Sequence, residues 1–367
     1  MDTNTSDYSC LKDKFYGCIA SAYIGASMGA AVESWDWKKI DNTYGVLDQL
    51  LPYEHFQNGW QRVPGTTESG IERMKMISSA IFKKKGRVSA EDVRRTWIRV
   101  LDSKPIDMTL APFDADLLHL AKSIVPARDF GRYADFSGLT WFARSCHPVG
   151  LINAGDPVHA GEDTLEVGQL YHITNGRGVK WAMVVAIAIA EATKPGASVD
   201  SVIGKVYDLC DKELVIRELD KQLTYSADCK DFSELRSAFD NEYRGHGMPY
   251  PHSFANEVVT KALCVFRMVK GNPKDALLAS VNMGRDTSSL ATIAAGISGA
   301  LSGADSLPLE WIKQIDKATA ENLYTCDNIS ISNHSDNLLQ SYISRSNHMK
   351  SLVDMSESDP EYMSEFV

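Results

Sequence analysis

Apolar residues recur every three or four positions along most of this chain, which is the spacing of one face of an α-helix. The first such segment, 11–33, has small residues at Gly17, Ser21, Gly25 and Gly29. Their four-residue spacing makes a smooth stripe on one helix face, which predicts the close approach of another helix. Further helices are predicted at about 68–84, 89–101, 161–172, 177–193, 199–211, 231–243, 253–269, 273–282, 286–302 and 308–318. Because no alternating series typical of strands is evident, the pattern predicts an all-α fold.

The chain is expected to form one compact domain, because no linker rich in Gly, Ser or Pro divides it. We place a flexible N-terminus at 1–10, the domain at 11–325 and a polar C-terminal tail at 326–367, and we expect the end of the tail to be disordered. Two long segments, 35–66 and 126–158, lack a clear period. Irregular segments of this length inside a helical domain usually line a site.

The composition of the 367 residues mainly excludes certain classes of protein. A hydrophobic fraction of 44% and a charged fraction of 23% are ordinary for a globular protein. The net charge of -10 does not favour binding to nucleic acid or to an anionic membrane. The longest apolar run, 181–190, is too short to span a membrane and favours a buried helix. The seven cysteines are scattered without a Cys-x-x-Cys pair, and the N-terminus lacks a signal-peptide pattern, so a cytoplasmic location is expected.

Four segments place short polar or acidic side chains where a loop meets a helix. They are Gly-Ala-Ser-Met-Gly-Ala-Ala-Val-Glu at 25–33, Pro-Gly-Thr-Thr-Glu-Ser-Gly at 64–70, Cys-His-Pro-Val-Gly-Leu-Ile-Asn-Ala-Gly-Asp-Pro at 146–157 and Val-Asn-Met-Gly-Arg-Asp-Thr-Ser-Ser at 281–289. A helix N-terminus presents free N–H groups and the positive end of the helix dipole, which suit carboxylates and phosphates. These segments therefore indicate a polar site at helix ends.

Together the four segments resemble the ADP-ribosylglycohydrolase family over roughly residues 11–318. The last family motif, Gly-x-Asp-Thr-Asp-Thr, opens a helix rich in Ala and Gly, as residues 284–289 do here. The second family motif is Thr-Asp-Asp-Thr, or Thr-Glu-Asp-Gly in some members, and the middle one, Asn-Ala-Gly-Asp-Pro, is intact at 153–157. The resemblance implies a compact all-α domain that hydrolyses N- or O-glycosidic bonds to ribose, commonly in ADP-ribose, with two Mg²⁺ ions.

Carried over to this chain, the resemblance implies metal ligands at Thr67, Glu68, Ser69, Asp286, Ser288 and Ser289. Three positions at which the family has Asp are serines here, namely Ser27, Ser69 and Ser288. Mg²⁺ is normally held by carboxylates together with waters or phosphates, and serine hydroxyls are neutral, weaker ligands. The ligand charges therefore leave three alternatives open: two metal ions, one metal ion, or no functional metal.

The remaining polar residues receive roles by the same comparison. We assign catalytic positions to Glu33, Glu68, Asp286 and Asp156, and ligand-binding positions to Asn153, His147, Trp35, Trp60 and Arg285. Most of them also have a structural interpretation. Asn153 and Asp156 fit an Asx turn that caps the next helix, His147 fits a loop spacer, and the aromatic residues fit a core. Glu72 and Arg73 are expected to form a helix-surface or intrahelical pair without a catalytic role.

Two hypotheses for the activity remain open. The first is a glycosidic-bond hydrolase with weakened or absent Mg²⁺ dependence that acts on a ribosyl or nucleoside-type small molecule. The second is a repurposed metal-independent lyase, isomerase or cyclase, or a noncatalytic binding protein, because the ligand acids are replaced together while the packing glycines are kept. Metal dependence and the released product distinguish the two. Either hypothesis is compatible with a monomer or a small homo-oligomer.

Overall fold

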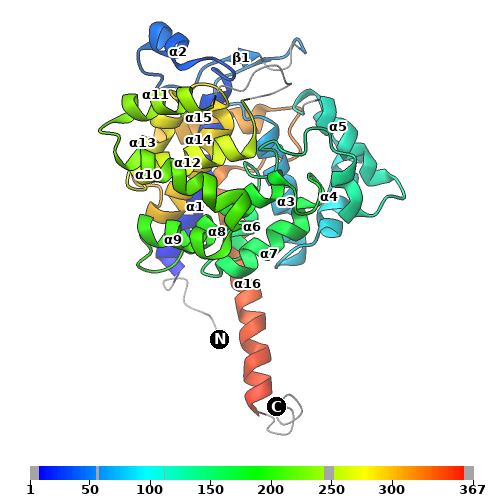
Figure 1. Ribbon diagram of the computed structural model, residues 1–367. Helices are drawn as coiled ribbons and strands as arrows, with labels where there is room; N and C mark the ends of the chain where they lie inside the picture. The colour runs from blue at the N-terminus through cyan, green and yellow to red at the C-terminus, as the bar shows by residue number, and fades with distance from the viewer. Residues whose placement is uncertain (1–7, 55–57, 111, 244–251, 359–367) are drawn as a thin grey trace.

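The computed structural model describes residues 8–54, 58–110, 112–243 and 252–358 (Figure 1). Its elements are α1 (Ser9–Ala30), α2 (Trp37–Tyr44), β1 (Tyr53–Glu54), β2 (Gln61–Arg62), α3 (Ser69–Lys84), α4 (Ala90–Ser103), η2 (Ile106–Met108), α5 (Pro112–His119), η3 (Leu120–Lys122), η4 (Ala127–Arg132), α6 (His147–Ile152), α7 (Pro157–Gly168), α8 (Arg177–Ala192), α9 (Val199–Leu209), η5 (Lys212–Ile216), α10 (Arg217–Ala227), α11 (Phe232–Glu242), α12 (Ala255–Met268), α13 (Pro273–Val281), α14 (Thr287–Ser302), α15 (Leu309–Glu321) and α16 (Ile331–Ser358). In these ranges the only strands are the short antiparallel pair β1 and β2, and the predicted all-α fold is confirmed. No helix in the same ranges has both the length and the apolar composition needed to cross a membrane.

Helices α1 and α14 pack against each other along the stripe of small residues. A Cβ atom placed on Gly25 would lie 2.6 Å from the carbonyl carbon of Ala291, and one on Gly29 would lie 2.6 Å from Cα of Ser288. A larger side chain at either glycine would therefore force the two helices apart. The close approach brings the C-terminal end of α1 beside the N-terminal end of α14.

Helix α8 is a second central element of the core. Every residue from 184 to 192 in this helix is buried. The helix packs against α6, α7, α12 and α14, so apolar residues are required on nearly all of its faces. The uninterrupted apolar run in the sequence is thus a buried helix, as predicted.

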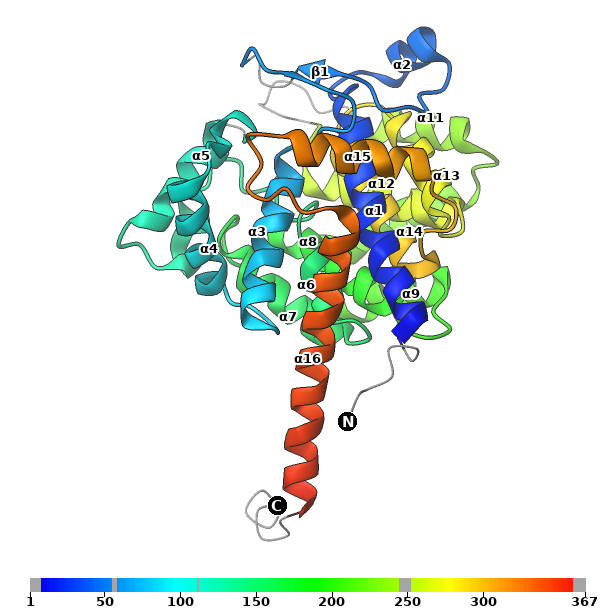
Figure 2. The ribbon, with the colours of Figure 1, turned by 180° about the vertical axis from the view of Figure 1, so that it is seen from behind.

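The chain after residue 325 differs from the polar tail expected from the sequence. Helix α16 crosses α1, α3 and α6 and then projects from the body of the molecule (Figure 2). Its body end is buried at His334 and Leu338. The ring of His334 lies 2.8 Å from the hydroxyl of Tyr23 and 2.6 Å from the hydroxyl of Ser78. The polar composition of this segment did not indicate a buried helix, because one of its buried positions is a histidine whose two hydrogen-bond partners lie on other helices.

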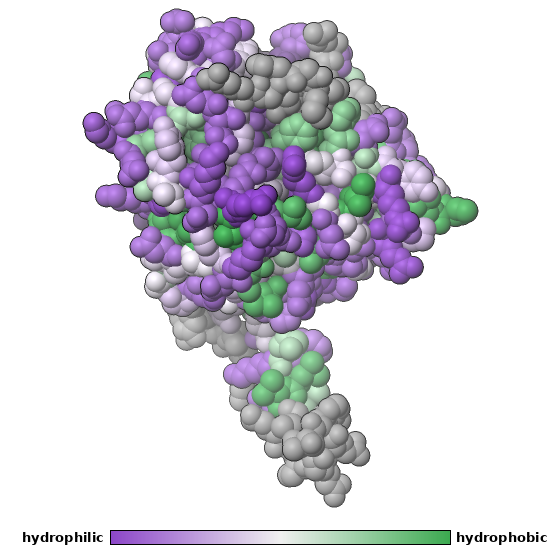
Figure 3. Space-filling model, in the orientation of Figure 1, coloured by the Kyte–Doolittle hydropathy of each residue, from purple (hydrophilic) through white to green (hydrophobic). Residues whose placement is uncertain are grey.

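The far end of α16 is an exposed part of the molecule. In the view of Figure 3 the surface is mainly hydrophilic, and apolar residues gather on the projecting helix. Met349 and Leu352 are among its exposed apolar side chains. Helix α1 begins at Ser9, so Ser9 and Cys10 of the predicted flexible N-terminus are helical. The rest of that prediction concerns mostly residues 1–7, and the disorder expected for the end of the tail concerns mostly residues 359–367. Both stretches lie outside the described residues.

Candidate functional site

Two carboxylates meet the first turn of α14. Asp286 is the N-cap of this helix, and its side chain accepts a hydrogen bond from the N–H of Ser289 at 3.1 Å. Oε2 of Glu33 accepts a hydrogen bond from the N–H of Ser288, also at 3.1 Å. The first N–H groups of a helix have no partner within it, and the helix dipole favours negative charge at this end. Two neighbouring N–H groups of α14 therefore hold two acids at one place.

The position of Glu33 depends on the turn that follows α1. Ser34 has a positive φ of 66°, and its N–H donates to the carbonyl of Arg285 at 2.8 Å. The N–H of Arg285 donates in return to the carbonyl of Trp35 at 2.7 Å. These two bonds tie the turn after α1 to the segment before α14. Residues about 250 positions apart in sequence are thereby fixed next to one another.

A third carboxylate is the N-cap of α3. Oε2 of Glu68 accepts hydrogen bonds from the N–H of Gly70 at 2.9 Å and from the hydroxyl of Ser69 at 3.1 Å. Glu68 is 3% exposed, and its other oxygen, Oε1, has no hydrogen-bond partner among the described residues. A buried carboxylate oxygen without a partner is costly. Glu68 thus retains one acceptor oxygen without a hydrogen-bond partner in this part of the molecule.

Arg144 joins the α3 end of the site to the α14 end. Its Nη1 lies 3.0 Å from Oε2 of Glu68, and its Nη2 donates to the hydroxyl of Ser69 at 2.9 Å. Nη1 also donates to the hydroxyl of Ser289 at 3.4 Å. The Arg144 side chain is 13% exposed, so solvent screens its charge less than it would at the surface. One cation therefore contacts residues from two of the predicted polar segments.

The segment that precedes Arg144 adds a hydroxyl to the site. The side chain of Thr140 lies 3.4 Å from Oδ2 of Asp286 and 3.3 Å from the hydroxyl of Ser289. The N–H of Thr140 donates to the carbonyl of Ser253 at 2.9 Å, which anchors this segment beside the start of α12. Thr140 is buried, so its position is set by these contacts.

The surroundings of the two α14 acids move their pKa values in opposite directions. Burial raises the pKa of Glu33 well above its ordinary value, and the nearby carboxylate of Asp286 raises it further. Burial also acts to raise the pKa of Asp286, but the charges of Arg144 and His252, with side-chain hydrogen bonds, bring it below its ordinary value. Glu33 is therefore the acid of the pair that holds a proton more readily, and Asp286 is the one that ionises more readily.

The structure brings the two predicted ligand triplets, one at residues 67–69 and one at residues 286–289, to one location. Their serines place neutral hydroxyl groups there. The hydroxyls of Ser69 and Ser289 both accept a hydrogen bond from Arg144. The N–H of Ser288 donates to the carboxylate of Glu33, and Thr67 is buried with 2% of its surface exposed. The predicted triplets are thus linked to each other by a guanidinium group.

Comparison of motifs did not identify Arg144 or Thr140. Both lie in the segment 126–158, which was expected to line a site because of its length and lack of period. Arg144 contacts Ser69 and Ser289, which are 75 and 145 residues away in the chain. Contacts over such separations leave no local spacing that a sequence pattern can reveal. The irregular segment itself was the one available signal.

Glu33, Glu68 and Asp286 are called the acid cluster below. Asn153 and Asp156 are not part of this cluster. The amide nitrogen of Asn153 donates to the carboxylate of Asp163 at 2.7 Å, and its oxygen accepts from Arg345 at 2.7 Å. Asp156 is the N-cap of α7 and accepts a hydrogen bond from the N–H of His159. The Asn-Ala-Gly-Asp-Pro motif therefore caps α7 and holds α16.

The distance between this motif and the acids follows from α1. The N–H of Gly155 donates to the carbonyl of Ala190 near the end of α8, where Lys14 donates to the carbonyl of Ala192 at 2.8 Å. Lys14 lies in the first turns of α1, whereas Gly29 lies beside the start of α14. The helix rises by about 22 Å between these two residues. The motif and the acids thus lie toward opposite ends of α1.

His147 and Arg285 have partners within the chain. Nε2 of the fully buried His147 lies 3.1 Å from the carbonyl of Thr292, and burial lowers the pKa of this histidine to about 4. The Arg285 side chain donates to both carboxylate oxygens of Glu257, at 2.6 and 2.9 Å. Both side chains support the elements around α14 instead of extending into the acid cluster.

The two predicted ligand-binding tryptophans also contact neighbouring side chains. Trp35 stacks on Tyr44, and the ammonium group of Lys39 lies 3.6 Å from the centre of its ring. The guanidinium of Arg62 lies 4.2 Å from the ring centre of Trp60. These contacts order the aromatic segment between α1 and α3.

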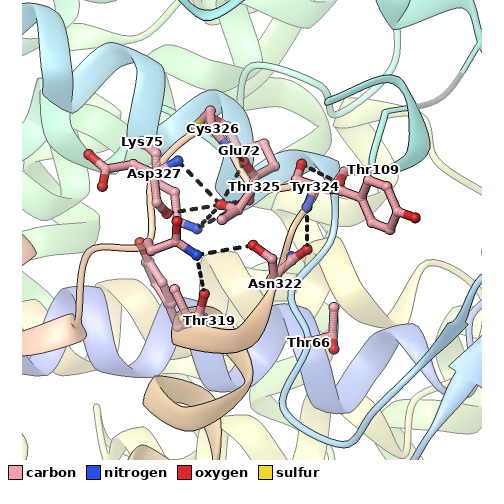
Figure 4. Close-up of polar contacts among 12 residues, drawn as sticks. Thr66, Glu72, Lys75, Thr109, Thr319, Asn322, Tyr324, Thr325, Cys326 and Asp327 are labelled. Atoms are coloured by element: carbon pink, nitrogen blue, oxygen red, sulfur yellow. Dashed lines mark hydrogen bonds and ion pairs between the residues drawn. The ribbon is translucent and has the colours of Figure 1, made fainter. Parts of the chain in front are cut away.

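A buried polar network lies one turn along α3 from Glu68 (Figure 4). The carboxylate of Glu72 accepts hydrogen bonds from Lys75 at 3.1 Å, from Thr325 at 2.9 Å and from the N–H of Cys326 at 2.7 Å. Glu72 is fully buried and Arg73 is 3% exposed, so the helix-surface alternative predicted for these two residues is wrong, and Glu72 forms an ion pair within α3 with Lys75. Glu72 also attaches the segment before α16 to α3.

Comparison with known proteins identifies the fold and the family. The model of the ADP-ribosylglycohydrolase family matches residues 7–339, which includes the acid cluster and the buried turns of α16. A solved structure described as an ADP-ribosylglycohydrolase-related protein complex is similar, with a TM-score of 0.63 and 13% identity over 91% of this chain and 98% of that chain. At this identity the similarity shows a shared fold. No curated protein matches the sequence. Because the family match spans nearly the whole chain, this protein belongs to the ADP-ribosylglycohydrolase family.

Proposed function

We propose that this protein hydrolyses a glycosidic bond to ribose in a ribosyl or nucleoside-type small molecule. The observation that supports the proposal is the meeting of Glu33 and Asp286 at the first turn of α14. Cleavage of a riboside passes through an oxocarbenium-like cation, and it needs a carboxylate near that cation and a proton for the leaving group. Two acids with different proton affinities supply these two functions.

Glu33 is the proposed proton donor, because its raised pKa favours the protonated carboxyl. Asp286, whose pKa is held low, is proposed to stay ionised, to stabilise the cation and to orient the attacking water. The proton that this water loses returns to Glu33, which has given its own proton to the leaving group. Glu68 is proposed to accept a hydrogen bond from a ribose hydroxyl through Oε1, the oxygen without a partner among the described residues. Asp156 has no role in this proposal, because it caps α7.

The residues at the site do not fit the two Mg²⁺ ions that the family resemblance implies. Mg²⁺ sites rely on carboxylates, but Ser69 and Ser288 stand at two of the expected ligand positions. The cationic group of Arg144 contacts Ser69 and Ser289, one residue from each ligand triplet. Within the part of the chain that the structure describes, no three His, Cys, Asp or Glu side chains are grouped to hold a metal ion. We therefore assign no step to a metal and propose a reaction that these side chains perform.

Release of free ribose or ADP-ribose from a panel of ribosides tests the proposal. The assay uses chelator-treated protein with nucleosides and ADP-ribosyl compounds. Glu33→Gln is expected to slow release by about 10²-fold or more, because a general acid usually contributes that much. The matched control is Glu213→Gln, which changes an exposed glutamate paired with Arg217 and is expected to leave the rate unchanged. Equal rates for wild type and Glu33→Gln would remove Glu33 from the mechanism.

A second candidate function uses the same acids in a metal-independent lyase, isomerase or cyclase. The contacts of Arg144 favour this alternative, because a fixed guanidinium is suited to bind an anionic ligand. The products separate the two candidates. Hydrolysis adds water and releases a free sugar, whereas isomerisation or cyclisation leaves the sugar attached.

A further inference from the structure

We propose that the guanidinium of Arg144 occupies the place between the two ligand triplets that the family resemblance assigns to a divalent cation. The native chain then carries its own cation at this site and excludes the metal, and a chain without that guanidinium binds one. The inference concerns the site of the proposed function, but it does not depend on the hydrolytic reaction. It can therefore be tested by ion binding alone.

The contacts of Arg144 are the first argument. In the cluster its side chain contacts Glu68 at 3.0 Å, Ser69 at 2.9 Å and Ser289 at 3.4 Å. Each of these residues stands at a position at which the resemblance places a metal ligand. The distances are those of hydrogen bonds and ion pairs. The ligand positions are thus arranged around a guanidinium group.

The charges of the cluster are the second argument. Two Mg²⁺ ions would bring four positive charges, and one guanidinium brings a single charge. Serines at 69 and 288 remove two of the carboxylates that would balance the ions. The acids that remain in the cluster are Glu33, Glu68 and Asp286. The loss of anionic ligands therefore matches the smaller charge of the cation.

The rigidity of the site is the third argument. The N–H of Arg144 donates to the carbonyl of Thr140 at 3.0 Å, and Thr140 is anchored in turn to Ser253. The partner carboxylate of Glu68 is 3% exposed and is held by the first turn of α3. On this fixed backbone the guanidinium is held by its own contacts with Glu68, Ser69 and Ser289. A divalent ion that approaches the acids meets a fixed like charge.

Binding of Mn²⁺, measured by the loss of the free-ion EPR signal, tests the inference on the full chain. Arg144→Gln removes the charge and leaves a shorter, neutral polar side chain, and it is expected to bind Mn²⁺ at least about tenfold more tightly than the wild type. Adding Ser69→Asp to this variant is expected to increase the affinity further, because it restores an anionic ligand. Adding Asp286→Asn to Arg144→Gln is expected to abolish the gain. Arg217→Gln, at an exposed arginine, is the matched control and is expected to behave like the wild type.

Two results would overturn the inference. One is tight Mn²⁺ binding by the wild type that disappears in Asp286→Asn. The other is a folded Arg144→Gln protein, checked by circular dichroism, whose Mn²⁺ affinity equals that of the wild type. If Arg144→Gln alone does not fold, Arg144→Gln with Ser69→Asp is compared with the wild type by the same criterion. Failure of every riboside to react bears on the proposed function only.

Discussion

Replacing Gly25 by alanine tests whether the glycine stripe sets the distance between α1 and α14. A Cβ atom at Gly25 would lie 2.6 Å from the carbonyl carbon and 2.7 Å from the carbonyl oxygen of Ala291. Both atoms belong to the backbone, so no side-chain rotation can relieve the clash. Carbon atoms in contact are normally about 3.5–4.0 Å apart, so the helices must separate by roughly 1 Å.

The magnitude follows from two opposing terms. Overpacking a core by a methyl group costs about 1–3 kcal/mol. Alanine in place of glycine within a helix contributes about 0.5–1 kcal/mol in the other direction. Gly204 in α9 isolates the second term, because no atom of the described residues lies within 4 Å of a Cβ placed there. The difference between Gly25→Ala and Gly204→Ala is therefore the steric cost, about 1–3 kcal/mol.

Urea unfolding monitored by circular dichroism measures the free energy of unfolding of both variants. Gly204→Ala is expected to be slightly more stable than the wild type, and Gly25→Ala less stable. Separation of the helices also moves Glu33 away from the N–H of Ser288, so activity should fall in Gly25→Ala alone. Equal stabilisation by the two substitutions would refute the argument that the stripe determines the helix spacing.

Three further predictions concern stability. Folding raises the pKa of Glu33, so the wild type should lose stability as the pH rises from the ordinary glutamate range through the raised value, whereas Glu33→Gln should not show this loss. Urea unfolding at about pH 5 and about pH 8 measures the change in stability, and an equal loss in both proteins would contradict the prediction. Arg345→Ala removes hydrogen bonds to the carbonyl of Ile152 and to Asn153, both at 2.7 Å. It should lower the free energy of unfolding by about 1–3 kcal/mol and speed hydrogen exchange in α16. Unchanged exchange would show that these bonds do not hold the helix. Burial lowers the pKa of His334 to about 3, so the unfolded chain binds a proton that the native protein does not, and stability should fall as the pH drops below about 6.5. His334→Gln should reduce this acid sensitivity in melting experiments, and identical acid profiles would argue against it.

The helices with a continuous apolar face could be predicted closely from the sequence. Helix α8 begins at the expected residue 177, and α14 begins one residue after the expected 286. Spacing and caps are local signals, so they can be recognised without knowledge of the fold. Helix α7 begins at Pro157, four residues before the predicted start, because Asp156 acts as its cap. Helix α16 was missed, because its buried face includes polar residues such as His334 whose partners lie on other helices.

The site could be predicted only in part. The resemblance singled out Glu33, Glu68 and Asp286, and the structure brings these acids to the adjoining ends of α1, α3 and α14. The same resemblance also singled out Asn153, which instead joins α6 to α16. Arg144 was not identified, because the sequence around an arginine in an irregular segment does not indicate which distant residues its side chain contacts.

The sequence by itself determined the helical class, the small-residue stripe and the acids at helix ends, because these depend on spacing and chemistry within one segment. Only the tertiary structure decided which of the polar residues share a location. Arg144 reaches Ser69 and Ser289 across 75 and 145 residues, and the N–H of Ser288 reaches Glu33 across 255. Such contacts arise from the packing of α1 on α14 and of the segment before α6 on both helix ends. They determine the charge and the proton affinities of the site, and a linear pattern does not encode them.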